Sequence, residues 1–111
     1  MIGGNVTAEV RRAKMALSAQ GKAIEGGTET VMEIVGWLDY QGGQKGHTAY
    51  QAPIEDTTHV FLSDYDADYA SQKEDGLSLV VGGRRYEVLL IDDPMGLHEH
   101  LETFLRYAGD A

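Results

Sequence analysis

Two adjacent glycines, Gly82 and Gly83, separate two runs of β-forming residues, and this pattern constrains the fold more than any other feature. The runs are Leu77–Val81 and Arg85–Ile91, both rich in valine, leucine or isoleucine. The favoured two-residue hairpin turns need positive φ angles, which glycine adopts without steric cost. The sequence therefore predicts an antiparallel hairpin and favours an all-β protein.

Other segments extend this pattern along the chain. Residues 28–39 and 54–62 are dense in β-branched and aromatic residues, and Gly36 within the first suggests a bend or a bulge. Residues 6–11 alternate between apolar and polar, although 8–19 also contains good helix formers. We expect a strand there, followed by a loop from about residue 18 to 27.

The C-terminal segment 97–107 is ambiguous, because its apolar residues fit one face of a helix and one face of a strand equally well. Its β-rich surroundings favour a strand. The sum is a single domain over residues 1–111 in which residues 1–27 are only weakly assigned. We expect a small open barrel or sandwich of five to six mostly antiparallel strands with long loops.

Composition removes several classes of function. The 111 residues carry 9 Lys and Arg against 18 Asp and Glu, a net charge of −9, which argues against wrapping nucleic acid or docking on an anionic membrane. No apolar run is long enough to span a bilayer, and the N-terminus lacks the pattern of a secretory signal. The absence of cysteine excludes disulfides and thiolate sites. We expect a cytosolic protein, or one in an assembly that forms there.

Two loops stand out by composition. The first has three glycines and no periodicity, which predicts a mobile loop; its residues are Gln41, Gly42, Gly43, Gln44, Lys45, Gly46, His47 and Thr48. The second, from Ser63 to Gly76, is a predicted surface loop with five acids: Asp64, Asp66, Asp68, Glu74 and Asp75. Its start resembles a calcium loop, but Tyr69 stands where that loop needs glycine. A solvated acidic loop is the better interpretation.

No residue pattern indicates an enzyme. His98, His100 and Glu102 would share one face of a strand, but they lack the spacing of a helical metal-binding pair, which favours a polar strand face. The adjacent Asp92 and Asp93 would point to opposite faces, so we expect a turn before Pro94 rather than an acid–base pair. Trp37 is expected in the core. The sequence predicts no catalytic residue, metal or cofactor.

One long stretch resembles a known family. Its residues are Gly36-Trp37-Leu38-Asp39, then Tyr50-Gln51-Ala52, then Ile54–Leu62 with Asp64-Tyr65, then Gly82–Met95 including Tyr86-Glu87-Val88 and Ile91-Asp92-Asp93-Pro94-Met95, and finally His98, His100-Leu101-Glu102 and Leu105-Arg106-Tyr107. These segments, about two thirds of the chain, resemble the head-closure proteins of long-tailed phages with non-contractile tails, also called head–tail joining or stopper proteins.

The resemblance implies a structural part of the virion neck, assembled in the host cytoplasm. Members of that family form homo-oligomeric rings between a portal or adaptor protein and a tail terminator or tail-tube protein. The ring closes the channel after DNA packaging, and the packaged DNA later passes through without specific binding. In this sequence the resemblance favours Gln41–Ala52 as the plug of the channel. The Ser63–Gly76 loop is the second candidate, and its acids would face either the lumen or the next subunit.

Two alternatives stay open at this point. Another neck component of similar size is one, although an adaptor would be helical and a tail terminator would pack helices on a sheet. A small metal-binding module that uses His98, His100 and nearby acids is the other, from a different class of function.

Overall fold

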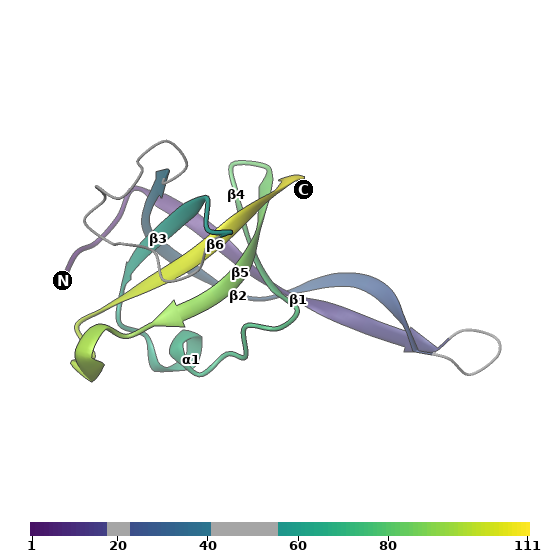
Figure 1. Ribbon diagram of the computed structural model, residues 1–111, viewed down its shortest axis with the longest axis horizontal. Helices are drawn as coiled ribbons and strands as arrows, with labels where there is room; N and C mark the ends of the chain where they lie inside the picture. Colours follow the sequence, from purple (N-terminus) through teal and green to yellow (C-terminus); the bar gives the residue numbers. More distant parts are fainter. Residues whose placement is uncertain (18–22, 41–55) are drawn as a thin grey trace.

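Six antiparallel strands form one sheet that closes on itself. The computed structural model describes residues 1–17, 23–40 and 56–111. The strands are β1 (Val6–Leu17), β2 (Ala23–Tyr40), β3 (His59–Asp64), β4 (Leu77–Val81), β5 (Arg84–Asp92) and β6 (His100–Asp110). They follow the order β1-β2-β3-β6-β5-β4, and β4 pairs back with β1 (Figure 1). The predicted all-β class is confirmed, and the barrel is closed rather than open.

The predicted hairpin is present as β4 and β5. Gly82 and Gly83 have φ angles of 58° and 79°, and Val81 pairs with Arg84 across the turn. Both glycines therefore occupy the left-handed region that the two-residue turn requires. The prediction from these two residues was correct because turn chemistry is local.

Inward-facing side chains from all six strands fill the barrel. The fully buried members include Val10 of β1, Phe61 of β3, Leu79 of β4 and Leu101 and Leu105 of β6. Alternation along each strand directs these residues inward and their neighbours outward. The core therefore joins segments that lie far apart in the sequence.

The N-terminal segment differs from the expectation. β1 continues to Leu17 and β2 already begins at Ala23, so the predicted loop from 18 to 27 is wrong for residues 23–27. The helical alternative is excluded for residues 8–17. Cross-strand pairing holds both strands extended, because Leu17 lies opposite Ala23 and a register shift beyond Ala13 accommodates the glycines of β2.

Gly36 marks the residue where β2 changes partners. It lies opposite Val6 of β1 and also opposite Ser63 of β3, and no register shift occurs there. A Cβ atom at this position would lie 2.1 Å from the carbonyl oxygen of Leu62. Close approach of two backbones therefore requires glycine here, and of the two predicted features, a bend or a bulge, the bulge is absent. One register shift between β1 and β2 falls beyond Val10 instead.

The ends of β3 and β6 also shifted from the expected bounds. Residues 54–55 of the predicted strand lie outside the described residues, and β3 starts at His59. Just before it, the Thr58 N–H donates to the Leu105 carbonyl (2.8 Å), but the Thr58 hydroxyl rather than a backbone carbonyl accepts from the Tyr107 N–H (2.8 Å). The strand prediction for 97–107 is confirmed from His100 onward. A short 3₁₀ helix, η1 (Pro94–Gly96), makes the predicted turn before it.

The Ser63–Gly76 segment is not a simple surface loop. Ser63 and Asp64 end β3, and a short helix, α1 (Ala67–Ala70), follows. Tyr69 of α1 is fully buried in the core, and its hydroxyl lies 2.8 Å from the buried Thr103 hydroxyl. Burial raises the pKa of Tyr69 well above its ordinary value, so the phenol stays neutral. In the described segments, neither helix has the length and apolar character to cross a membrane.

Candidate assembly surfaces

The first candidate surface is a two-stranded arm, defined as residues 13–17 of β1 and 23–28 of β2. β4 pairs with β1 only from Glu9 to Arg12, and β3 pairs with β2 only from Gly36 to Tyr40. Both long strands therefore continue past the barrel as a hairpin, which Figure 1 shows as a ribbon leading away from the other strands. The arm contributes to the elongated dimensions of the molecule, 49 × 29 × 25 Å.

The arm exposes two unpaired strand edges. Within the described residues, no strand pairs with the second edge of β2 between Ala23 and Val35, or with that of β1 between Lys14 and Leu17. Unpaired N–H and C=O groups on such an edge are a template for another strand, and natural proteins usually cover or charge them. These two edges are free because β1 and β2 pair with each other over a longer stretch than β4 and β3 pair with them.

An exposed apolar stripe follows the outer face of β2. Val31, Val35 and Trp37 are 41%, 52% and 43% exposed. The indole N–H of Trp37 donates to the Ile2 carbonyl (3.0 Å). The core prediction for Trp37 is therefore wrong, because strand alternation directs the side chains of Ile34 and Leu38 inward and that of Trp37 outward.

Aromatic rings gather where the segment between β2 and β3 leaves and rejoins the barrel. The His59 ring lies between Tyr40 and Tyr86, with centroid distances of 5.2 and 4.9 Å, and Tyr107 lies 6.4 Å away. Burial lowers the pKa of His59, and the positive charge of Arg84 lowers it further, against a smaller opposing effect of Asp39. The predicted plug residues Gln41–Thr48 lie outside the described residues, next to this cluster in sequence.

The predicted acidic residues are not gathered into one cluster, and the side chains of the first two accept separate local hydrogen bonds. Asp64 accepts hydrogen bonds from the backbone N–H groups of Ile2 and Gly3, which lower its pKa. Asp66 caps the N-terminus of α1 by accepting from the Tyr69 N–H (3.0 Å). Asp68 is exposed in the first turn of that helix.

The other two acids lie beside β5 and β1. The Glu74 carboxylate accepts from the Ile91 N–H (3.2 Å), and the Asp75 carbonyl accepts from Arg12 (3.3 Å). The sequence did not indicate that the side chains of Asp64, Asp66 and Glu74 accept hydrogen bonds from backbone N–H groups. Asp66, Asp68 and Asp75 are exposed, whereas Asp64 and Glu74 are partly buried.

A groove with a volume of about 680 Å³ lies between the base of the arm and the β4–β5 hairpin. Its charged lining residues are Arg12, Arg85, Arg106, Glu74, Asp75 and Glu87. Arg106 is paired with Glu87, which raises the pKa of Arg106. The Ser78 hydroxyl in the wall is buried without a hydrogen-bond partner in the described part of the chain. Positive and negative groups are balanced here, so the groove does not define a site for one charged ligand.

Of the strand face considered from the sequence, His100 and Glu102 lie together, whereas His98 lies outside β6. His98 precedes the strand with a φ of 57°, stacks on Tyr65 and pairs with Asp93. His100 pairs instead with Glu102 (3.0 Å). Across residues 1–17, 23–40 and 56–111, no three His, Asp or Glu side chains are placed to hold a metal ion.

Comparison of the sequence with models of known protein families gives no match, and comparison with curated protein sequences gives none either. Function must therefore be inferred from these surfaces. Sequence reasoning missed the arm, which is the most prominent of them. No clear local signal marks it, because residues 12–17 are mostly helix formers and residues 23–27 include two glycines and a glutamate, which are uncommon in strands.

Proposed function

We propose that this chain is the subunit of a homo-oligomeric ring in the neck of a tailed phage virion. The ring closes the DNA channel after packaging and provides a surface for tail attachment. The observation that carries the proposal is the arm: a closed barrel satisfies its own strands, so the unpaired edges beyond it are useful chiefly for contact with another chain. Such contacts close into a ring when they join unlike surfaces by rotation.

A second feature supports the closing function. The connection between β2 and β3 follows Tyr40, the last residue of β2, and ends before His59, the first residue of β3, and both of these residues belong to the aromatic cluster. Packed rings at its base give this long connection a firm attachment. We assign the channel plug to residues 41–52 of this connection, as the family resemblance implies.

Charge supports the passage of DNA without specific binding. The net charge of −9 repels phosphates, which would keep the lumen of the ring from retaining the genome. The partners in this proposal are copies of the same chain, a portal or adaptor protein on the head side, and a tail terminator or tail-tube protein on the tail side. A tail terminator is the less suitable assignment for this chain, because the described helices span only Ala67–Ala70 and Pro94–Gly96.

The test uses DNA-filled capsids from the virus that encodes this chain. Capsids that lack the protein should lose their DNA and fail to bind tails, and adding the purified wild-type protein should restore both. A variant with residues 42–48 replaced by a short Gly-Ser linker should still bind to capsids but leak DNA. If capsids without the protein retain DNA and accept tails, the proposed function is wrong.

Charge reversal at an exposed acid tests the role of the lumen. Asp68→Lys should slow genome ejection, whereas the neutral control Asp68→Asn should do so less. Asp68 suits this purpose better than Asp66, because Asp66 caps α1 and its replacement would also disturb the helix. Equal ejection by wild type and Asp68→Lys would argue against a lumen position for this residue.

A further inference from the structure

We infer that the arms of neighbouring copies pair edge to edge, with the free edge of β1 from one copy against the free edge of β2 from the next. This inference rests on the proposed function, since the ring supplies the neighbouring copies. It adds the surface through which they join. The free edges are Lys14–Leu17 on β1 and Ala23–Val35 on β2.

The two strands carry opposite charge, which selects the partner edge. On the free edges themselves, residues 14–17 of β1 contain one base, Lys14, and no acid, whereas residues 23–35 of β2 contain three glutamates and no base. When β1 of one copy joins β2 of the next, basic and acidic strands alternate across the extended sheet. Pairing of two β1 edges or two β2 edges would instead place like charges side by side, which is unfavourable.

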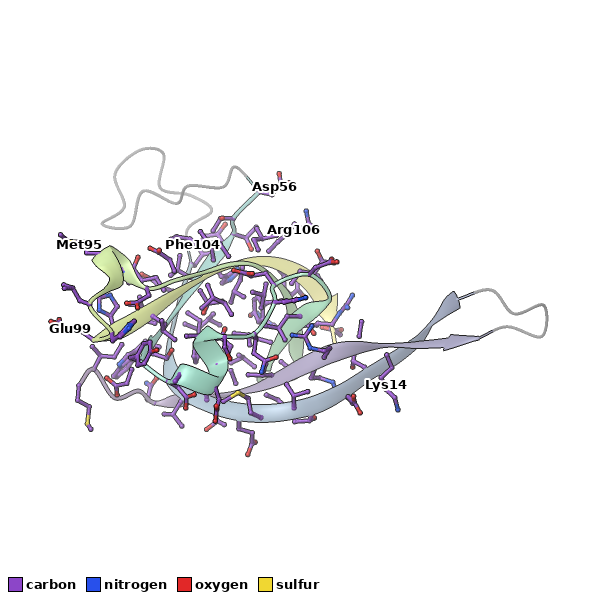
Figure 2. All side chains as sticks on the ribbon, turned by 90° about the horizontal axis from the view of Figure 1, so that it is seen from below. Lys14, Asp56, Met95, Glu99, Phe104 and Arg106 are labelled. Carbon is purple, nitrogen blue, oxygen red and sulfur yellow. The ribbon has the colours of Figure 1, made fainter. Side chains whose placement is uncertain are left out.

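Two exposed charges, one on the arm and one on the free edge of β2 next to it, are available for this contact. Lys14 is exposed beside the free edge of β1, and Figure 2 shows it on the arm side of the molecule. Glu29 of β2 lies opposite Arg12, but the guanidinium of Arg12 binds the Gln72 side chain and nearby carbonyls instead. Glu29 thus forms no ion pair within the described residues, although it is exposed.

Symmetry, like charge, favours pairing between unlike edges. A contact between like edges is isologous and ends at a dimer, whereas a contact between unlike edges leaves one free edge at each end and continues. The exposed Val31 and Val35 lie on the β2 strand that receives the neighbour. A second chain on that edge would reduce their exposure, because side chains of adjacent strands pack against each other on each face of a sheet.

Disulfide cross-linking tests this arrangement directly, because the chain has no cysteine of its own. Two single variants, Lys14→Cys and Glu29→Cys, are purified, mixed in equal amounts, bound to portal-containing capsids and oxidised. We expect severalfold more cross-linked dimer from the mixture than from either variant alone. The matched control mixes Lys14→Cys with Glu99→Cys, an exposed position at the opposite end of the molecule (Figure 2), and should give little product.

A charge exchange provides the second measurement. Lys14→Glu and Glu29→Lys should each reduce ring assembly severalfold, and the double variant should recover most of it, as counted by electron microscopy of capsid-bound rings. Circular dichroism verifies that each variant is folded. The arm pairing is wrong if rings form but the mixture of cysteine variants gives no cross-linked dimer, or if one cysteine variant alone cross-links equally well. Either result would leave the proposed ring intact. Absence of rings from capsids would overturn the proposed function itself.

Discussion

Replacing Tyr69 by Phe should destabilise the protein by about 1–3 kcal/mol, because it leaves the Thr103 hydroxyl buried without a partner. Tyr69 and Thr103 are both fully buried, and their oxygens lie 2.8 Å apart. Water cannot replace the lost hydroxyl at such a position without rearrangement of the core. For a chain of this size, the loss corresponds to a fall in Tm of roughly 4 °C per kcal/mol.

A double-mutant cycle isolates this hydrogen bond. Thr103→Val alone leaves the Tyr69 hydroxyl without a hydrogen-bond partner and should lower the free energy of unfolding by a similar amount. The double variant removes both polar groups, so its loss of stability should be smaller than the sum of the two single losses by about 1 kcal/mol or more. Urea unfolding followed by the fluorescence of Trp37, the single tryptophan, gives each free energy of unfolding.

The matched control is Tyr107→Phe, since Tyr107 is 43% exposed and its replacement should change stability by no more than about 0.5 kcal/mol. If Tyr69→Phe costs no more than this control, or if the two single costs simply add, α1 does not anchor to the core through this hydrogen bond.

Three further predictions concern the barrel and its ends. Gly36→Ala should lower the free energy of unfolding by about 3 kcal/mol or more, because its Cβ would lie 2.1 Å from the Leu62 carbonyl oxygen; an unchanged urea midpoint would contradict this. The pKa of His59 is lowered in the folded state, so the unfolded chain binds the proton more readily and the free energy of unfolding should fall as pH decreases from 7 to 5. His59→Gln should make this pH dependence less steep, and an equal slope in wild type and variant would refute the prediction. Asp64→Ala removes the acceptor for the amides of residues 2–3, whose hydrogen exchange should accelerate; unchanged protection would show that other contacts hold them.

Local features of the sequence predicted a good part of the fold. The Gly82-Gly83 pair predicted its hairpin because positive φ angles depend on the residues in the turn alone. β-forming character likewise predicted most of the strands, including β6, whose apolar spacing also fitted a helix. The candidate plug residues and the neck function rest on family resemblance and remain predictions.

The remaining features depend on which segments meet in space. Trp37 points outward although large aromatic residues are usually buried, because the register of β2 gives the inward positions to its neighbours. Tyr69 lies in a polar, acid-rich segment, and no local pattern distinguishes it from a surface residue; only the barrel end that receives it decides its burial. Burial is a property of the assembled core rather than of the residue.

The sequence by itself thus determined the β class, the hairpin turn and the acidic character, which depend on backbone propensity and on composition. Tertiary structure alone decided that β1 pairs with β4 to close the barrel, and that β1 and β2 continue beyond their barrel partners. Closure and stagger are set by the register between strands distant in sequence, and register depends on how all six strands share one core. The arm, with its two unpaired strand edges, follows from that stagger.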